Sequence, residues 1–283
     1  MKVRLFATEI YPLLKEISQL LMKFSIDSPQ AEAELIVSHF YKLTRTQIFQ
    51  NPDLHVTWKM RLMIEKLLRT RYHHCPLQYL LGEVEFYNSI LKVTPDVLIP
   101  RPETELLVDI ILQENPDKNL RVCDLGTGSG AIAIALKKTR PDWQVTATDI
   151  SPEALLLARQ NGQNNNCQIE FLLSDIFSEI NTKFDLIVSN PPYIAESDYL
   201  LLESELFYEP KNALTASENG LYFYHKIIHS ASKYMNLPAN LYLEIGAEQN
   251  SQITKLANQA GAKKIITKQD YNNFDRFMII NFS

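Results

Sequence analysis

CDLGTGSG, residues 123–130, joins a strand-like apolar run to the helix-like segment AIAIALKKT, residues 131–139. It holds Gly126, Gly128 and Gly130, three of only eight glycines in 283 residues. Glycine permits a tight strand-to-helix turn and lets the backbone approach a ligand closely. Because the chain is otherwise sparing with glycine, we expect this cluster to form a ligand-binding loop rather than an ordinary turn.

Around this loop, strand-like and helix-like segments alternate. Helix-like segments open at Pro102 and occupy Pro152–Asn161, Leu221–Met235 and Ser251–Ala260. The strand-like runs are Leu120–Leu125, Gln144–Asp149, Ile169–Ser174, Asp185–Ser189, Asn240–Ile245, Lys264–Thr267 and Arg276–Asn281. The alternation predicts an α/β domain whose mostly parallel sheet is covered by helices on both faces. Only a short turn separates the last two runs, so we expect an antiparallel hairpin at one edge.

Residues 1–83 have a different pattern and predict a separate helical domain. Apolar residues recur at helical spacing in Glu9–Phe24, after Ser28-Pro29 and in His55–Tyr72. Ser28 followed by Pro29 is typical of a helix start. Residues 84–100 are then expected to form a hairpin or short extended linker, and residues 101–283 the α/β domain.

The composition excludes several classes of protein. No run approaches 18 apolar residues, and Glu9 interrupts the N-terminus where a signal peptide needs an apolar core. Three widely spaced cysteines fit neither a disulfide framework nor a zinc motif, which favours a reducing cytoplasm. The net charge is −5, with +2 in residues 1–85 and −7 in the remainder, so a large polyanion is a poor partner for the α/β domain.

Two carboxylates near the glycine loop indicate its ligand. Asp149 ends the next strand-like run, 19 residues beyond the loop, where a carboxylate can accept hydrogen bonds from ribose hydroxyls. Gly126, Gly128 and Ala131 satisfy the dinucleotide pattern, so the loop alone leaves NAD possible. Asp124 favours a cationic group over a pyrophosphate, because phosphate sites use backbone N–H groups and cations. S-adenosylmethionine lacks phosphate and carries an ammonium and a sulfonium, so it fits better than NAD.

Asn190-Pro191-Pro192-Tyr193 directly follows the strand-like run FDLIVS. The two prolines lack N–H groups and have fixed φ angles, so their turn is rigid and presents carbonyl acceptors. Asn190 adds an amide oxygen and Tyr193 a flat apolar wall. Accepting both hydrogens of a planar –NH2 group at Asn190 Oδ1 and the Pro191 carbonyl would orient its nitrogen and stabilise the developing positive charge. No histidine base lies between positions 75 and 224, and alignment for in-line displacement needs none.

Longer matches point to a family. The glycine loop resembles the first motif of class I S-adenosylmethionine-dependent methyltransferases, and Asp175-Ile176 stands where that class contacts adenine. LIPRPETELLV, residues 98–108, together with NPPYI closely resembles the peptide chain release factor N5-glutamine methyltransferases (PrmC/HemK family). Further matches are Pro76, Tyr79, Gly82, Phe86, Glu209-Pro210, Ala213-Leu214, Gly220-Leu221, Glu244-Ile245-Gly246, Gln249, Asp270 and Asp275-Arg276.

The resemblance implies a fold, a substrate and site residues. The fold is a Rossmann-like seven-strand sheet with an antiparallel edge hairpin, preceded by a helical bundle that helps to bind the substrate protein. The substrate is the glutamine of the GGQ tripeptide in class I release factors, and S-adenosyl-L-homocysteine is the other product. The implied cofactor contacts are Asp124, Gly126, Thr127, Gly128, Ser129, Gly130, Asp149, Asp175, Ile176 and Asn190. The implied glutamine contacts are Asn190, Pro191, Pro192, Tyr193 and Phe86, with Asn190, Pro191 and Tyr193 as the catalytic group and Arg101–Thr104 lining the site.

Some positions depart from the family's pattern. Residues 237–240 (LPAN) and Asn272-Asn273 stand where relatives often have glycine. Because asparagine tolerates the left-handed region, we expect Asn240, Asn272 and Asn273 to serve as turn residues. Ile176 is not the aromatic residue of some relatives.

No metal is expected, since residues 73–75 (HHC) suit a solvated helix end and the histidines of HKIIH lack the HExxH glutamate.

We therefore expect a cytoplasmic, monomeric enzyme that methylates the N5 amide of a release-factor glutamine, without direct contact with nucleic acid or a membrane. The alternative enzyme is a nucleic-acid methyltransferase acting on adenine N6 or guanine N2. The acidic charge and the lack of a basic target-recognition segment argue against it. A third hypothesis is a non-catalytic binding module with the same fold, and the set of Asp124, Asp149 and NPPY argues against that.

Overall fold

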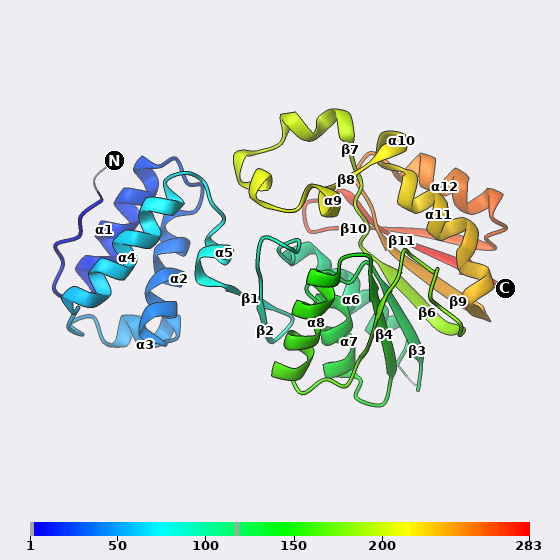
Figure 1. The fold of residues 1–283 in the computed structure, drawn as a ribbon, viewed down its shortest axis with the longest axis horizontal. Helices are drawn as coiled ribbons and strands as arrows, with labels where there is room; N and C mark the ends of the chain where they lie inside the picture. The colour runs from blue at the N-terminus through cyan, green and yellow to red at the C-terminus, as the bar shows by residue number, and fades with distance from the viewer. Residues whose placement is uncertain (1–2, 117–118) are drawn as a thin grey trace. The chain divides into compact units, whose positions relative to one another are not determined.

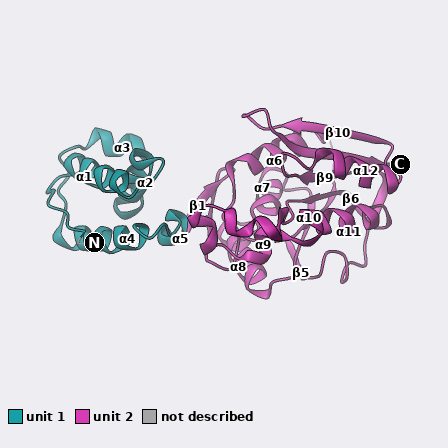
Figure 2. Ribbon diagram, turned by 90° about the horizontal axis from the view of Figure 1, so that it is seen from above, with its two compact units in different colours: residues 1–82 teal, residues 83–283 magenta. Residues whose placement is uncertain are grey.

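The computed structural model describes residues 3–116 and 119–283 (Figure 1). The chain passes from one folded unit, residues 1–82, to a second, residues 83–283, between Gly82 and Glu83 (Figure 2). The helices of the first unit are α1 (Ile10–Lys23), α2 (Pro29–Tyr41), α3 (Arg45–Gln50), α4 (Trp58–Arg71) and α5 (Leu77–Leu81). The sequence pattern predicted α1, α2 and α4 and missed the two short helices, which have less than two turns each.

The first unit has its own apolar core. The helical spacing on α1 buries Leu13, Leu14 and Ile17, and these side chains pack against residues of α2 and α4. The N-terminal ends of α3 and α4 are capped by threonine hydroxyls, since Thr44 accepts from the backbone N–H of residue 47 and Thr57 from that of residue 60, both at 3.2 Å. Each cap satisfies an N–H group that the helix itself leaves without a partner.

A buried ion pair links α4 to α2. Arg71 is 2% exposed and donates from Nε and Nη2 to the two carboxylate oxygens of Glu32, at 2.9 and 2.7 Å. Its Nη1 atom donates to the main-chain carbonyl of Cys75 at 3.2 Å. Because a buried guanidinium needs a partner of opposite charge, this bidentate contact ties the two helices together.

A β-hairpin opens the second unit. Strands β1 (Glu83–Phe86) and β2 (Ser89–Lys92) pair around the two-residue turn Tyr87-Asn88, whose φ angles are 45° and 58°. Left-handed conformations at both positions match the twist of a tight hairpin. The hairpin packs on α6 (Pro102–Glu114), α7 (Ala131–Thr139) and α8 (Pro152–Asn164).

Seven strands form the sheet of the second unit, in the order β10-β11-β9-β6-β3-β4-β5. Their bounds are β3 (Arg121–Leu125), β4 (Gln144–Asp149), β5 (Glu170–Leu173), β6 (Phe184–Ser189), β9 (Met235–Glu244), β10 (Lys264–Gln269) and β11 (Asp275–Phe282). Strands β9, β6, β3, β4 and β5 are parallel, whereas β11 is antiparallel to both β9 and β10. The predicted parallel sheet and edge hairpin are confirmed.

Of the three predicted turn asparagines, Asn272 and Asn273 do lie in the turn between β10 and β11, whereas the prediction for Asn240 is wrong. Asn240 lies inside β9, where it pairs with Leu186 on one side and Asn281 on the other. Asn272 does not have a positive φ, and of the three asparagines only Asn273 does, with 63°. The strand begins at Met235, which pairs with Phe184 of β6, and an irregularity in the register separates this pair from that of Asn240 with Leu186.

Helices cover both faces of the sheet (Figure 1). Neighbouring strand residues point to opposite sides, so Val122 joins the core under α6 and α7, whereas Cys123 joins the core under α11 (Tyr222–Ala231) and α12 (Asn250–Gln259). Helix α8 packs beside α7 and along β4 and β5. Among the described residues, no helix combines the length and apolar character needed to span a membrane.

A long excursion between β6 and α11 contains only short elements. These are β7 (Ile194–Ala195), the 3-10 helices η1 (Glu196–Leu201) and η2 (Ser204–Tyr208), α9 (Lys211–Leu214), β8 (Thr215–Ala216) and α10 (Ser217–Gly220), and a further 3-10 helix, η3 (Ser232–Tyr234), follows α11. Glu209 ties the excursion to the segment before α6, since it accepts from Ile99 N at 3.0 Å and from Arg101 Nη2 at 2.5 Å. The residues after β6 are thereby held beside those that precede α6.

Candidate functional site

The carboxyl ends of β3, β4, β5 and β6 meet at one edge of the sheet, and a cavity of about 300 Å³ opens there. Ligands of open parallel sheets bind at this edge, where strand order reverses. Seven predicted site residues from the loop and the ends of β4 and β5 line the cavity: Gly126, Thr127, Gly128, Ser129, Asp149, Asp175 and Ile176. Asn190, Pro191 and Pro192 from the end of β6 line the same cavity, as do Arg101 and Thr104.

The loop glycines have two different roles. Gly126 and Gly128 have φ angles of 70° and 55°, and a Cβ on either would point into open space. Gly130 does not line the cavity: a Cβ there would lie 3.1 Å from Ile134 Cδ1 and 3.3 Å from Ala158 Cβ. The first two therefore shape the loop at the cavity, and the third allows α7 to pack closely on α8.

Asp124 supports the loop from behind rather than lining the cavity. It is 1% exposed, and its Oδ2 atom accepts from Thr127 Oγ1 at 2.6 Å and from Ala133 N at 3.2 Å. Its Oδ1 atom has no hydrogen-bond partner among the described residues. Burial raises the pKa of Asp124 to about 7. The carboxylate thus fixes both ends of the loop and keeps spare acceptor capacity beside it.

Asp149 lies at the end of β4 and does line the cavity. Its Oδ2 atom accepts from Gly128 N at 2.8 Å, and its Oδ1 atom accepts from Ser151 N at 2.9 Å. Burial raises its pKa, and these backbone donors oppose the shift. Each carboxylate oxygen can accept a further hydrogen bond, so two vicinal hydroxyls of a ligand fit here.

The turn after β5 places an aliphatic side chain at the cavity. Ile176 has a φ of 55°, which is unusual for a β-branched residue. Ser174 holds this turn, because its Oγ atom donates to the Ile176 carbonyl at 3.1 Å and accepts from Glu179 N at 3.1 Å. Together with Phe223 and Ile227 of α11, Ile176 gives the cavity an apolar wall.

Tyr193 anchors the NPPY turn but does not line the cavity. Its main-chain carbonyl accepts from Gln249 Nε2 at 2.9 Å, and the Oε1 atom of Gln249 accepts from Gly246 N at 3.2 Å. Burial raises the pKa of the Tyr193 hydroxyl, and the charges of Glu244 and Arg276 act on it in opposite directions. Gln249, a matching residue to which the sequence assigned no role, therefore holds this turn.

The prediction that Phe86 contacts the substrate is wrong in this structure. Phe86 is 1% exposed and lies in the core formed with α6 and α7, because the alternation of β1 directs it inward. Leu98, two residues before the PRP segment, lines the cavity instead. Ile150, which follows Asp149 and is 61% exposed, also lines it, and its position at a strand end was a signal that could have found it. Phe223 also lines the cavity, but nothing in its sequence position indicated this.

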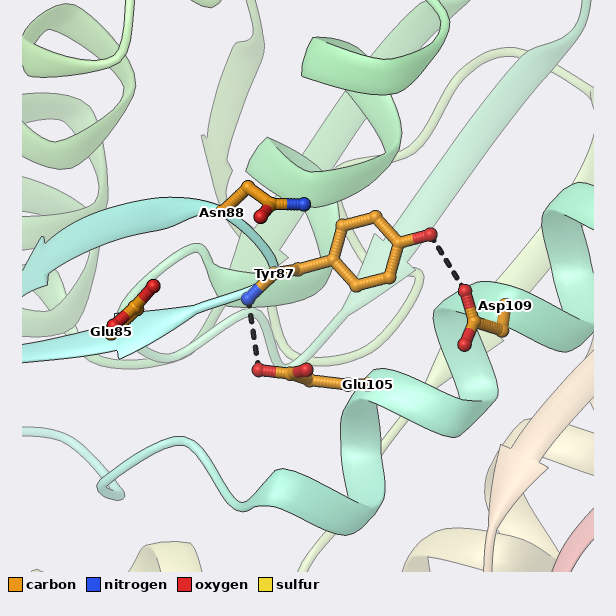
Figure 3. Close-up of a pocket in the computed structure, with 5 residues that line it drawn as sticks. All are labelled: Glu85, Tyr87, Asn88, Glu105 and Asp109. Carbon is orange, nitrogen blue, oxygen red and sulfur yellow. Dashed lines mark hydrogen bonds between the residues drawn. The ribbon is translucent and has the colours of Figure 1, made fainter.

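A second pocket lies at the turn of the β1–β2 hairpin (Figure 3), and of the motif residues only Glu105 of LIPRPETELLV lines it. It has a volume of about 500 Å³ and is lined by Glu85, Tyr87, Asn88, Glu105 and Asp109. Tyr87 donates from its main-chain N to Glu105 Oε1 at 2.9 Å and from its hydroxyl to Asp109 Oδ1 at 2.7 Å. These contacts fasten the turn to α6. Nowhere in the described ranges do three His, Cys, Asp or Glu side chains gather as metal ligands would.

Comparisons with known proteins agree with this geometry. Residues 102–224 match the family described as the methyltransferase small domain, and residues 12–82 match the PrmC N-terminal domain. A release factor glutamine methyltransferase of Streptococcus pneumoniae is 46% identical over 80% of this chain and 81% of its own length. The chain belongs to the release factor glutamine methyltransferase family. The predicted family and fold class are thereby confirmed.

Other relatives of this family cover nearly the whole chain. The release factor glutamine methyltransferase of Thermodesulfovibrio yellowstonii is 37% identical over 95% of this chain and 98% of its own length. Among solved structures, a methyltransferase from Pyrococcus furiosus has a TM-score of 0.51 at 19% identity, covering 68% of this chain and 87% of its own. A 16S rRNA methyltransferase of T. thermophilus (RsmC), solved with AdoMet and guanosine, has a TM-score of 0.52 at 14% identity, covering 71% of this chain and 50% of its own. These two structures show the shared class I methyltransferase fold.

Proposed function

We propose that this protein transfers a methyl group from S-adenosylmethionine to the N5 side-chain amide of the glutamine in the GGQ motif of class I peptide chain release factors, leaving S-adenosyl-L-homocysteine. The observation that carries the proposal is the meeting of the glycine loop, Asp149 and Asn190-Pro191-Pro192 around one cavity. Methyl transfer from a nucleoside cofactor to an amide requires that both bind in the same cavity.

The cavity residues suit S-adenosylmethionine. Asp149 has acceptor capacity for two ribose hydroxyls, and the backbone at Gly126 and Gly128 leaves open space on the ligand side. Ile150 and Ile176 offer aliphatic surface for a flat base, in place of aromatic stacking. The spare acceptor of Asp124 lies beside the loop and suits an ammonium group through an intervening water. When bound, S-adenosylmethionine supplies an electrophilic methyl group.

The residues after β6 suit a primary amide. An amide nitrogen is a poor nucleophile because its lone pair is delocalised into the carbonyl group. Asn190 Oδ1 and the Pro191 carbonyl can accept its two hydrogens, hold the nitrogen toward the methyl donor and stabilise the positive charge that grows on it. The rigid proline turn keeps these acceptors in place without cost at the moment of reaction. Release of one proton to water after transfer completes the balance.

The relatives' name and the match of residues 12–82 support a role for the helical unit in binding the release factor. We extend the proposal to a monomeric enzyme of the cytoplasm that needs no metal and has no nucleic-acid substrate. In this scheme Pro192 keeps a direct role because it lines the cavity, whereas the role of Tyr193 becomes indirect because it anchors the turn.

The test uses labelled S-adenosylmethionine with a purified class I release factor and, in separate reactions, DNA and RNA. We expect one methyl group on the GGQ glutamine by mass spectrometry, and none on a release factor with alanine in place of that glutamine. Asn190→Ala should abolish transfer while the cofactor affinity stays within about threefold, because Asn190 acts on the amide. Label on nucleic acid with none on the release factor would overturn the proposal.

A further inference from the structure

Two consecutive hydrogen bonds connect a buried carboxylate to the Asn190 side chain. Glu244 ends β9 and is 2% exposed, and Thr104 lies in the first turn of α6 and is 4% exposed. The Thr104 hydroxyl donates to Glu244 Oε2 at 2.7 Å. Asn190 Nδ2 donates to Thr104 Oγ1 at 3.4 Å, a longer contact than the usual 2.9–3.0 Å. The amide of Asn190 is therefore in contact with the protein interior as well as with the cavity.

The chemistry of these groups sets the direction of the two bonds. An ionised carboxylate can only accept hydrogen bonds, so the single proton of Thr104 goes to Glu244. Thr104 Oγ1 can then only accept from Asn190, which selects Nδ2 as the atom that faces it. The other end of the amide, Oδ1, is left toward the cavity, where an acceptor is needed.

We propose that Glu244 and Thr104 are positioning residues that orient the Asn190 amide so that Oδ1, and not Nδ2, faces the nitrogen to be methylated. The proposal rests on the function proposed above, and it adds a residue pair that holds the acceptor in the productive orientation. Neither residue needs to touch the substrate nitrogen for this role.

Protonation of Glu244 reverses the order of donors. A neutral carboxyl can donate to Thr104 Oγ1, which frees the Thr104 proton to donate to Asn190 Oδ1 and turns Nδ2 toward the substrate. An –NH2 group facing another –NH2 group lacks an acceptor, so this form is inactive.

The groups around Glu244 set the pH at which its carboxylate becomes protonated. Burial raises the pKa of Glu244 to about 7, and Glu103 adds to this, while the Thr104 hydrogen bond and the charges of Arg276 and Arg101 oppose it. Glu244 also acts on the hydroxyls of Tyr193 and Tyr224, and burial raises the pKa of both. Because the ionised form is the active one, the rate should fall as the pH falls through about 7.

The first test compares Thr104→Val with Thr104→Ser, using a purified release factor at saturating S-adenosylmethionine. Valine has the shape of threonine without its hydroxyl, and we expect kcat to fall roughly 10- to 100-fold, as for other losses of orientation. Serine retains the hydroxyl and should recover the rate to within about threefold of the native protein. Because Thr104 lines the cavity, the cofactor dissociation constant and the thermal midpoint of each variant are measured alongside.

The second test is the pH profile of kcat for the native protein and for Glu244→Gln between pH 5.5 and 9. Glutamine has both an acceptor oxygen and an –NH2 donor but cannot titrate, so whatever rate Glu244→Gln retains should not fall at low pH. The same loss in Glu244→Gln would overturn the proposal, and so would a Thr104→Val variant as active as the native protein. If Thr104→Val fails to fold, the pH profiles decide. Absence of transfer by the native protein would instead refute the proposed function, so the two failures are distinct.

Discussion

Gln249 Nε2 donates to the main-chain carbonyl of Tyr193 across 2.9 Å and so fixes the end of the proline turn from the start of α12. Replacing Gln249 with alanine removes this donor and also the acceptor for Gly246 N. We expect kcat to fall roughly tenfold because the acceptors on the turn lose their fixed position. Cofactor affinity should change by less than about twofold, since Gln249 does not line the cavity. Gln259→Ala, the same change at an exposed position of the same helix, is the control and should leave both quantities unchanged.

Gly220 lies against the same carbonyl and beside the Gln249 amide. A Cβ at Gly220 would lie 2.1 Å from the Tyr193 oxygen, closer than any real contact, so the turn must shift to admit it. Gly220→Ala should lower both the activity and the thermal midpoint. Gly261 is a matched control because its φ of 86° is nearly the 83° of Gly220, while a Cβ there meets nothing within 4 Å. Equal losses in the two alanine variants would show that backbone strain alone, and not the contact with Tyr193, is responsible.

Asp149 supports predictions about cofactor affinity. Asp149→Ala removes the carboxylate that accepts from Gly128 N and Ser151 N, and with it the acceptors proposed for ribose. We expect the dissociation constant for S-adenosylmethionine, measured by calorimetry, to rise by about 10- to 100-fold, the effect of losing one or two hydrogen bonds to a charged group. Asp142→Asn, in the exposed turn before β4, should leave it unchanged. Unchanged affinity in Asp149→Ala would contradict the ribose assignment.

The buried pair in the helical unit predicts a large effect on stability. Glu32→Ala leaves the Arg71 guanidinium buried without its carboxylate, and such losses cost about 3–5 kcal/mol of unfolding free energy. Arg69 and Glu65 form a partly exposed pair at 3.5 Å, where the arginine side chain is 55% exposed. Arg69→Ala should cost less than about 1 kcal/mol. Urea unfolding followed by circular dichroism measures the unfolding free energy of both variants. A loss in Glu32→Ala as small as that in Arg69→Ala would show that Arg71 finds another partner.

The sequence predicted that most of the residues proposed for the cofactor would lie together, and they do line one cavity, because they are consecutive residues at strand ends. Asp149 and residues 126–129 needed only the position of the strands to be placed at one edge. The support behind the amide site was not predictable in the same way. Thr104 and Glu244 stand 140 positions apart and meet only when α6 packs on the sheet with its first turn against the end of β9. Phe86 was misplaced because its motif match gave no information on which face of β1 it occupies.

Burial of Asp124 predicts how the stability of the second unit depends on pH. The folded-state pKa is raised from 3.8 to about 7, so between these values the folded protein binds a proton that the unfolded chain has released. The contribution of this group is fully present below about pH 4 and is lost as the pH rises through 7. A single group of this kind changes the unfolding free energy by at most about 1.4 kcal/mol per pH unit.

Glu244 has a raised pKa for the same reason and adds to this dependence in the same direction. Urea unfolding of the cofactor-free protein from pH 5 to pH 8 should therefore show a stability that declines with pH. Asparagine at position 124 cannot titrate, so Asp124→Asn should reduce the decline of the unfolding free energy with pH. The control is Asp142→Asn, the same change at an exposed carboxylate, and its decline should equal that of the native protein. A slope unchanged in Asp124→Asn would mean that Asp124 is already ionised throughout this range, with a water or counter-ion on its Oδ1 atom.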